Sequence, residues 1–232
     1  MEIHKHLTGK FITFEGIDFS GKSVQAELLT KRLDSTGKVV QLFREPGGTE
    51  ISEKIRDILL DRRWDAMSHI TEMLLYSAAR AQLVEEKILP ALKQGHIVIC
   101  DRFYDSTTAY QGYGRGIDID VIERIHAIAT AGVVPDVTFV LDLPPEIALS
   151  RQANVQHSNS LKSPETREQS SGMGREGELD RLELQGLEFY QRVRQGYLLL
   201  AKQHPQRMHV IDATQTIETI HQKIWKIITQ IL

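Results

Sequence analysis

The sequence predicts an α/β fold of three layers, in which a mainly parallel sheet of about five strands lies between helices. Short apolar, β-branched runs alternate with longer segments whose apolar residues recur at helical spacing. A glycine-rich stretch, 16–23, joins the first of these runs to the first helical segment. The length of 232 residues, with no visible internal repeat, predicts one domain over 1–232.

The first elements show this alternation clearly. A buried parallel strand is expected at 11–14 (FITF), and a helix at 23–35, which Gly37 ends. A second strand at 38–43 and a short amphipathic helix at 50–60 follow. The chain therefore begins with two strand–helix units.

A longer helical pattern covers 68–93, and Pro90 is expected to kink it near its end. The third strand, 96–100, leads into the densest polar stretch, 101–112, with 113–116 expected as a flexible continuation. Because ligands collect at the carboxyl ends of parallel strands, this stretch is a candidate binding site.

The remaining elements continue the alternation. They are expected as a helix at 118–131, a strand at 137–141, a helix at 144–151, a helix at 181–203, a strand at 208–211 and a helix at 216–232. Between them, 154–178 is rich in Ser, Gly, Gln and charge and loses the hydrophobic period, so we expect it to be unstructured. We expect a mobile lid at about 151–180, and a plain disordered insertion is the alternative. Arginines flank it at Arg151, Arg167, Arg175 and Arg181.

Composition narrows the class of protein. With 41% hydrophobic residues, 25% charged residues and a net charge of −3, the chain reads as globular, and binding to nucleic acid is not expected. No run is apolar enough for a signal peptide or a membrane span, so no membrane partner is expected. The single cysteine, Cys100, forms no internal disulfide, which fits a reducing, cytoplasmic location. The histidines are scattered, which gives a zinc site little support.

The stretch 16–23 matches G-x-x-x-x-G-K-[ST], the phosphate-binding loop (P-loop) of nucleoside triphosphate enzymes. Its backbone N–H groups and the following helix N-terminus suit a polyphosphate. Lys22 is expected to reach the β- and γ-phosphates, and the Ser23 hydroxyl to ligate Mg²⁺. The residues expected to bind the ATP phosphates are Gly16, Ile17, Asp18, Phe19, Ser20, Gly21, Lys22 and Ser23. Because a bulky side chain is strained at positive φ, we expect a negative φ at Phe19.

If the bound nucleoside triphosphate donates its γ-phosphoryl group, the arginines of the chain indicate which kind of molecule accepts it. A phosphate monoester is already mostly anionic at neutral pH and attacks without a general base, whereas a hydroxyl needs one. Two anions that approach each other need positive groups, and these arginines are Arg44, Arg56, Arg80 and Arg102. The sequence therefore favours a nucleotide acceptor over a nucleoside. For Arg102, which follows Asp101, a structural ion pair between these two residues is the alternative.

Motifs along nearly the whole chain carry a resemblance to a known family. They are FEGIDFSGKS (14–23), REPGGT (44–49), EKIR (53–56), EMLLYSAAR (72–80), DRFYDSTTAYQGYGRG (101–116), PDVTFVLD (135–142) and DRLE (180–183). In this order they resemble the thymidylate kinase family. The resemblance implies a P-loop kinase that transfers the γ-phosphoryl group of ATP to dTMP, a step in dTTP synthesis, with Mg²⁺ as cofactor. It also implies a homodimer, with helices near 68–93 at the interface.

The resemblance implies roles for individual residues. At the transferring phosphate it places Lys22 and Arg102, with Asp101 and Ser23 on the Mg²⁺ side. The positions that match dTMP contacts are Asp18, Arg44, Arg56, Tyr76, Arg80, Arg102, Thr107, Tyr110 and Gln111.

The resemblance also implies which residues contact the base and the sugar of dTMP. Tyr76 would stack on thymine, Arg80 would donate to O4, and Thr107 and Gln111 would read the N3 and O4 edge. Asp18 would lie near the sugar 3′-hydroxyl, and Tyr110 would crowd C2′ and disfavour a ribose. The alternatives are a core tyrosine at Tyr76 and an Asx-type cap at Asp18.

Some members of this family carry an arginine inside the P-loop, whereas positions 17–20 hold none here. The catalytic cation is therefore expected from the lid, with Arg175 or Arg151 preferred and Arg167 next.

The sequence argues against three other functions. Another small P-loop kinase would share Lys22 and the lid, but the Tyr76/Arg80 pair argues against it. A GTPase-like switch would need an N-K-x-D motif, which the sequence lacks, and a DNA-associated ATPase would need a basic face.

Overall fold

The computed structural model describes residues 7–160, 181–182 and 184–232. Within them, a parallel sheet has the strand order β2–β3–β1–β4–β5. The strands are β1 (Lys10–Glu15), β2 (Val40–Arg44), β3 (Ile97–Asp101), β4 (Val137–Asp142) and β5 (Met208–Asp212). The predicted α/β fold with a parallel sheet of about five strands is confirmed.

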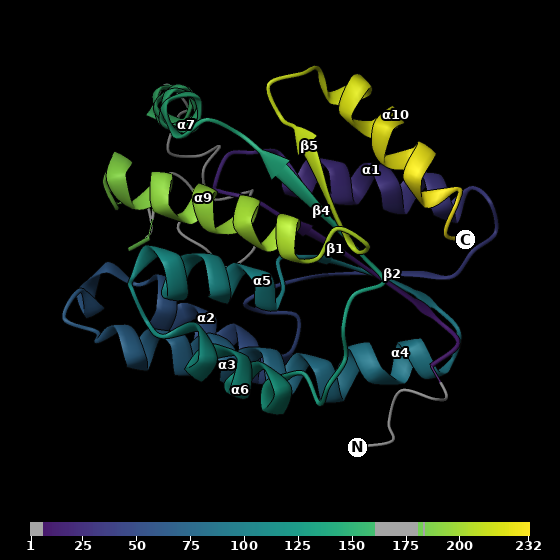
Figure 1. The fold of residues 1–232 in the computed structure, drawn as a ribbon, viewed down its shortest axis with the longest axis horizontal. Helices are drawn as coiled ribbons and strands as arrows, with labels where there is room; N and C mark the ends of the chain where they lie inside the picture. Colours follow the sequence, from purple (N-terminus) through teal and green to yellow (C-terminus); the bar gives the residue numbers. More distant parts are fainter. Residues whose placement is uncertain (1–6, 161–180, 183) are drawn as a thin grey trace.

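Helices cover both faces of this sheet. The α-helices are α1 (Lys22–Asp34), α2 (Glu50–Leu60), α3 (His69–Leu83), α4 (Leu89–Lys93), α5 (Tyr104–Thr107), α6 (Ile119–Ala129), α7 (Pro145–Ser160), α9 (Leu187–Gln203) and α10 (Ile217–Ile228). One 3₁₀ turn and two π-helical segments are η2 (Arg62–Trp64), η3 (Val84–Ile88) and η4 (Thr108–Gly114). In Figure 1, α1 and α10 lie on one side of the sheet, and α3, α4 and α6 lie on the other.

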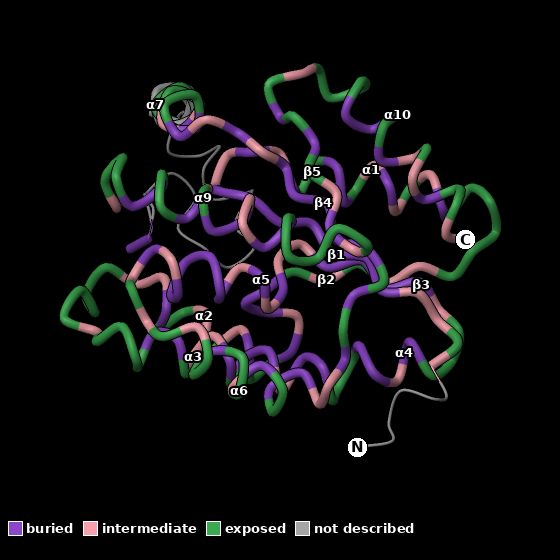
Figure 2. Tube along the Cα trace, viewed as in Figure 1, coloured by how far each residue is buried: buried purple, intermediate pink, exposed green. Residues whose placement is uncertain are grey.

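The central strand β1 contributes side chains to two hydrophobic cores, because successive side chains of a strand point to opposite faces of the sheet. Ile12 and Phe14 join one core with Leu29 of α1, whereas Phe11 joins the other with Leu83 of α3. Figure 2 shows the exposed outer sides of the helices, and the strands β1, β3 and β4 are buried along nearly their whole length. Burying each large apolar side chain stabilises the fold by about 1.5–3 kcal/mol.

The register of the central strands positions the functional loops. Phe14 lies opposite Asp101 of β3 and opposite Phe139 of β4. The strands β1 and β3 therefore end almost level, so the P-loop and the segment that begins at Arg102 leave the sheet side by side.

Two helical regions differ from the sequence predictions. The pattern over 68–93 changes to a π-helical turn at 84–88 before Pro90, which lacks the N–H that a regular α-helix would use there. The polar stretch 101–112, for which no helix was predicted, and the first residues of its expected flexible continuation are helical from Tyr104 to Gly114. The last residues of this helical segment pack against α9, and this tertiary contact outweighs the turn preference of its Ser, Thr and Gly residues.

The predicted lid is only partly covered by the described residues. Helix α7 continues to Ser160, so the expectation that 154–160 is unstructured is wrong. No Gly or Pro occurs between Glu146 and Ser160 to end the helix. Residues 161–180 lie outside the described part of the chain, and the helix expected from 181 begins at Leu187. Among the helices described, none combines the length and apolar character that crossing a membrane requires.

Candidate active site

The P-loop turns through an unusual backbone path between β1 and α1. Gly16 and Gly21 have φ of +136° and +93°, values that glycine adopts without steric cost. Phe19 has φ +61°, so the expectation of a negative φ is wrong. An L-residue in this region costs roughly 1–2 kcal/mol. The Phe19 carbonyl accepts a hydrogen bond of 3.1 Å from Arg151, which helps to hold this conformation.

The Lys22 side chain lies over the loop. Its Nζ donates to the Ile17 carbonyl at 2.9 Å, and the residue is 6% exposed. Burial, followed by the charge of Arg102, lowers the pKa of Lys22 to about 8. A polyphosphate bound in the loop would favour the charged amine and oppose this shift.

Ser23 and Asp101 meet where α1 begins and β3 ends. Ser23 Oγ donates to Asp101 Oδ2 at 2.5 Å, and Asp101 Oδ1 is buried without a hydrogen-bond partner among the described residues. Hydroxyl and carboxylate oxygens are the ligands that Mg²⁺ prefers, together with phosphate oxygens and water. This pair of side chains therefore fits the predicted Mg²⁺ site.

Arg102 is held in place from several sides. It has φ +71°, and its guanidinium forms an ion pair with Asp18 and donates to the Gly16 carbonyl at 3.0 Å and to Ser106 Oγ at 3.1 Å. Although burial alone would raise the pKa of Asp18, Arg102 and Lys22 hold it below its usual value. Arg102 therefore pairs with Asp18 of the P-loop.

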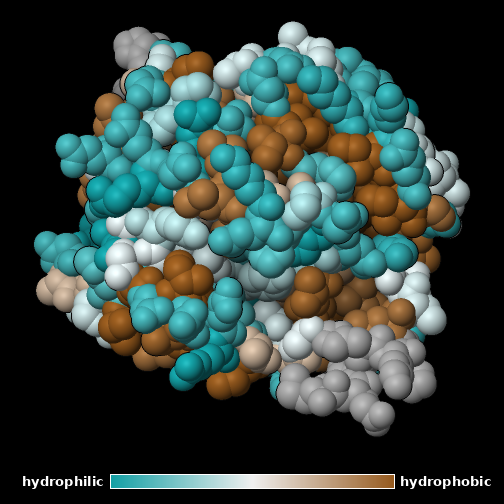
Figure 3. All heavy atoms as spheres, in the orientation of Figure 1, coloured by the Kyte–Doolittle hydropathy of each residue, from teal (hydrophilic) through white to brown (hydrophobic). Residues whose placement is uncertain are grey.

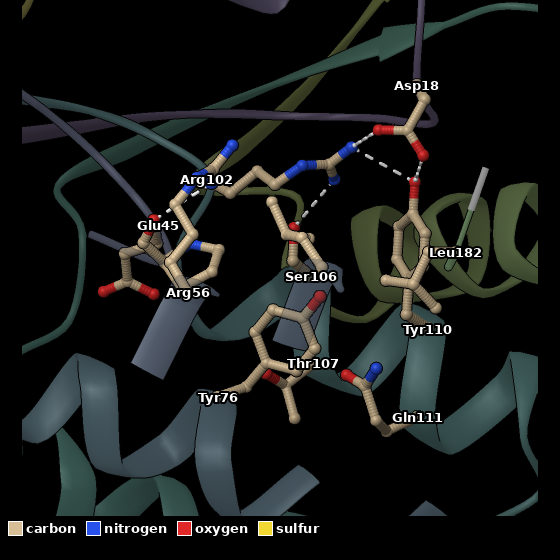
Figure 4. Close-up of a pocket in the computed structure, with 12 residues that line it drawn as sticks. Asp18, Glu45, Arg56, Tyr76, Arg102, Ser106, Thr107, Tyr110, Gln111 and Leu182 are labelled. Atoms are coloured by element: carbon tan, nitrogen blue, oxygen red, sulfur yellow. Dashed lines mark hydrogen bonds and ion pairs between the residues drawn. The ribbon is translucent and has the colours of Figure 1, made fainter. Parts of the chain in front are cut away.

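Two cavities adjoin at this position. The P-loop cavity is lined by Asp18, Phe19, Gly21, Lys22, Ser23, Val24, Arg44, Glu45, Arg56, Asp101 and Arg102. The second, which we call the base cavity, is lined by Asp18, Glu45, Pro46, Arg56, Leu60, Tyr76, Arg102, Ser106, Thr107, Tyr110, Gln111 and Leu182 (Figure 4). Asp18, Glu45, Arg56 and Arg102 line both cavities, so two arginines stand where the two spaces meet.

Most residues predicted to contact the acceptor base or its sugar line the base cavity. Tyr76, Thr107, Tyr110 and Gln111 do so, and Figure 4 shows the Tyr76 ring beside Thr107. Arg80 lies behind this wall: it is 1% exposed and donates to Thr107 Oγ1 at 3.1 Å.

Arg80 is also fixed by Glu45 and retains one free donor. Its Nε donates to Glu45 Oε2 at 2.7 Å, and its Nη1 is buried without a partner among the described residues. Burial outweighs the attraction of Arg80 and raises the pKa of Glu45 to about 7.

The two arginines predicted to bind the acceptor phosphate differ in their surroundings. Arg44 is exposed, pairs with Glu53 at 2.9 Å and lines only the P-loop cavity. Arg56 donates to the Pro46 carbonyl at 3.0 Å, as Arg44 does at 2.8 Å. Arg56 is therefore the better placed of the two, because it faces both spaces.

Of the predicted lid arginines, Arg151 is described. It donates to the Phe19 carbonyl and, at 3.0 Å, to the Ala213 carbonyl, so its guanidinium lies beside the P-loop. Arg167 and Arg175 fall outside the described residues.

Several side chains of this site were not singled out from the sequence. Glu15 accepts from the Phe103 N–H and from the hydroxyls of Ser106 and Tyr197, and Tyr190 donates to Asp18 at 3.2 Å. Glu45 belongs to the REPGGT motif, which offered a signal for it. Tyr190 and Tyr197 offered none, because they are far away in sequence and read as apolar positions of a helix.

Comparisons with known proteins agree on one family. A family model described as thymidylate kinase matches residues 14–224. Thymidylate kinase of Chlorobaculum parvum is 50% identical over 92% of this chain and 92% of that protein, and thymidylate kinase of Pelotomaculum thermopropionicum is 45% identical over 97% and 95%. The crystal structure of thymidylate kinase from Ehrlichia chaffeensis superposes with a TM-score of 0.71 at 34% identity, covering 95% of this chain and 98% of that one.

Proposed function

Because the chain belongs to the thymidylate kinase family, whose members phosphorylate dTMP to dTDP with ATP and Mg²⁺, we propose that its two cavities hold the two nucleotides of this reaction end to end. The P-loop cavity takes the ATP phosphates, and the base cavity takes dTMP. The enzyme class, the substrate pair and the family that the sequence predicted are thus confirmed.

The observation that carries this proposal is the shared boundary of the two cavities. Arg56 and Arg102 line both, and Lys22 stands on the P-loop side. The γ-phosphoryl group must cross this boundary to reach the acceptor, and its negative charge needs positive groups at that point.

Transfer forms a bond between a dTMP phosphate oxygen and the γ-phosphorus, and the bond from that phosphorus to the bridging oxygen breaks to release ADP. Arg102, held by Asp18, stabilises the charge on the transferring group together with Lys22. Arg56, and less directly Arg44, bind the acceptor phosphate. Mg²⁺, which Ser23 and Asp101 would hold, neutralises donor phosphate charge when bound.

The base cavity accounts for recognition of the acceptor. Tyr76 stacks on the thymine, and Thr107 and Gln111 face its polar edge. Arg80, whose buried Nη1 has no hydrogen-bond partner among the described residues, would donate to O4 from behind Thr107. Tyr110 donates to Asp18 at 3.0 Å, and this pair would lie beside the sugar of the bound acceptor. There Asp18 meets the 3′-hydroxyl, and the Tyr110 ring disfavours a 2′-hydroxyl.

Residues 1–232 act as one catalytic domain, and the lid supplies a cation from Arg151, Arg175 or Arg167. The protein acts in the cytoplasm, in keeping with one buried free cysteine, Cys100.

The protein also forms a homodimer. Exposed apolar side chains gather on neighbouring helices, which supports this part, and Figure 3 shows hydrophobic residues grouped over α3 and α6. They are Ile51 and Ile58 of α2, Ile70 and Leu74 of α3, and Val121 and Ile128 of α6.

The test is ADP release from ATP and Mg²⁺ with a panel of acceptors: dTMP, dUMP, dCMP, dAMP, dGMP, AMP, UMP and thymidine. We expect dTMP to be the preferred acceptor and thymidine to be inert. Lys22→Ala should reduce kcat by at least about a hundredfold, because a cation at the transferring phosphate is lost. Preference for another acceptor, or full activity in Lys22→Ala, would contradict the proposed roles.

A further inference from the structure

Glu72, which no step above uses, lies buried in the first turn of α3 and contacts a residue that lines the base cavity. Its Oε1 accepts from Gln111 Nε2 at 2.9 Å and from Arg115 Nε at 3.3 Å. Its Oε2 accepts from Arg115 Nη2 at 3.2 Å and forms an ion pair of 2.6 Å with Arg181. Both carboxylate oxygens are therefore engaged.

The charge state of Glu72 follows from these partners. Burial alone would raise its pKa, but the hydrogen bond from Gln111 and the charges of Arg115 and Arg181 hold the pKa below its usual value. The side chain is an ionised carboxylate at neutral pH. An ionised carboxylate accepts hydrogen bonds and donates none.

This acceptor determines how the Gln111 amide must lie. An amide carries two N–H donors on one branch and a carbonyl acceptor on the other. The Nε2 branch must face Glu72, so Oε1 must face away from it. Figure 4 shows Oε1 of Gln111 on the side of Tyr76 and Thr107, which line the base cavity. The base cavity therefore contains a hydrogen-bond acceptor, Gln111 Oε1, and Glu72 sets the direction in which it points.

We infer that Glu72 is a positioning residue that sets the base preference of the enzyme by holding Gln111 Oε1 toward the base cavity. The inference rests on the proposed function, in which that cavity binds the acceptor base. Thymine and uracil carry an N–H donor at N3, whereas cytosine carries an acceptor there. An oxygen fixed toward N3 favours dTMP and dUMP and opposes dCMP.

The two arginines keep the carboxylate from rotating. Arg115 donates through Nη1 to Gln185 at 3.0 Å, and its guanidinium lies 4.8 Å from the centroid of the Phe189 ring. Arg181 donates to the Leu59 carbonyl at 3.3 Å. The contact with Phe189 of α9 and the bond to Leu59 of α2 hold the two guanidinium groups without the Gln185 side chain, and the orientation of Gln111 is fixed with them.

The isosteric substitution Glu72→Gln separates shape from charge. The one oxygen of the new amide would turn toward the two guanidinium groups, and its NH₂ would face Gln111. Gln111 would then offer Oε1 to that NH₂ and turn its own Nε2 into the cavity. The group of Gln111 that faces the base then changes from a hydrogen-bond acceptor to a hydrogen-bond donor. A donor matches N3 of cytosine and repels N3–H of thymine.

The experiment compares kcat/KM for dTMP and dCMP in the wild type, Glu72→Gln and the control Gln185→Ala. Gln185 contacts the same arginines without touching Gln111. We expect the ratio for dTMP over dCMP to fall at least about tenfold in Glu72→Gln, with KM for ATP unchanged, and to keep its wild-type value in Gln185→Ala. An unchanged ratio in Glu72→Gln would overturn the inference.

A second pair of variants tests the route through Gln111. In Gln111→Leu nothing is left to orient, so adding Glu72→Gln should leave the ratio where Gln111→Leu sets it. A further fall in the double variant would show that Glu72 acts by another route and would overturn the inference.

A binding measurement on the wild type covers the case in which Glu72→Gln does not fold. By calorimetric titration, dTMP methylated at N3 should bind at least about tenfold more weakly than dTMP, because its donor is gone. Equal affinities would overturn the inference. If the wild type does not phosphorylate dTMP at all, the proposed function fails instead.

Discussion

Glu15 supports the position of Arg102 although the two side chains share no hydrogen bond. Its buried carboxylate accepts from the Phe103 N–H at 2.7 Å, from Ser106 at 2.6 Å and from Tyr197 at 2.9 Å. Phe103 follows Arg102 directly, so these bonds hold the backbone of Arg102 at its positive φ. Burial, followed by repulsion from Asp105, raises the pKa of Glu15 to about 7.

This raised pKa predicts a pH dependence of stability. From the ordinary value of 4.5 up to about 7, the folded protein retains a proton that the unfolded chain has released. The contribution of Glu15 to the free energy of unfolding should therefore fall as pH rises through this window, whereas His126, whose pKa burial lowers to about 3, contributes in the opposite direction in both proteins. The amide of Glu15→Gln does not titrate. Over the same pH range, the free energy of unfolding of this variant should therefore fall by about 1–3 kcal/mol less than that of the wild type.

Urea unfolding at about pH 5 and about pH 7.5 would measure this difference. Glu45, whose pKa is also raised to about 7, titrates in both proteins, and because the Glu15 charge contributes to that shift, Glu15→Gln should also make the contribution of Glu45 smaller. Equal falls in the wild type and in Glu15→Gln would contradict the prediction.

At this scale, the sequence predicts residues whose role depends on neighbours along the chain. Lys22 and Ser23 belong to one contiguous motif, and the structure places them around one cavity. The sign of φ at Phe19 was wrong because the loop path, with Arg151 on the Phe19 carbonyl, outweighs the preference of the side chain. Glu15 and Glu72 could not be assigned, since their partners come from distant segments.

Among the elements, α9 packs unusually closely against η4. A Cβ placed on Gly196 would lie 2.6 Å from Cδ2 and 2.9 Å from Cβ of Tyr113. Because the Tyr113 Cβ is fixed to the backbone, a rotation of the ring would not relieve the contact. The close approach of the two helical segments therefore requires glycine here.

Gly196→Ala should consequently destabilise the protein, although the same change in an exposed helix stabilises it by about 1 kcal/mol. We expect a net loss of about 1–2 kcal/mol, which lowers Tm by a few degrees. Gly186→Ala is the matched control, since nothing lies within 4 Å of a Cβ there. Thermal unfolding of both variants decides the point, and a Tm for Gly196→Ala at or above that of the wild type would refute it.

The same contact explains which elements the sequence predicted well. The strands were placed to within about two residues, because a buried parallel strand needs a continuous apolar run. No helix was predicted over Tyr104–Gly114, which the sequence shows only as a polar stretch with a flexible continuation, because Ser, Thr, Tyr and Gly are weak helix formers. Its helical form depends on packing against α9, which lies some 80 residues later in the sequence.

For the whole molecule, the proposed homodimer makes a prediction about mass. The chain of 26.4 kDa should sediment at about twice that mass, and Leu74→Glu should shift it to the monomer. Leu74 is 49% exposed on α3, among the apolar side chains of α2 and α6. A charge placed there would be buried without a partner in the dimer.

Ile217→Glu is the control for this prediction, since Ile217 is 57% exposed at the start of α10, on the other side of the sheet. Analytical ultracentrifugation should find this variant as large as the wild type. A monomeric wild type, or a dimeric Leu74→Glu protein, would contradict the proposed interface.

At this scale the sequence predicted the architecture and the family. A P-loop between a strand and a helix, followed by regular alternation, leaves few arrangements for a parallel sheet. The strand order β2–β3–β1–β4–β5 was not predicted, because it depends on which strands pair in space.

The direction of the strands has a practical consequence for surface-based measurements. Helix α10 follows β5 and runs back, so Leu232 lies toward the edge of the sheet where β1 begins, and Figure 1 shows the C-terminal end away from α7 and α9. The cavities open at the opposite edge. A molecule coupled to a sensor chip through its C-terminal end would hold its nucleotide sites toward the flowing solution, free to exchange ligand.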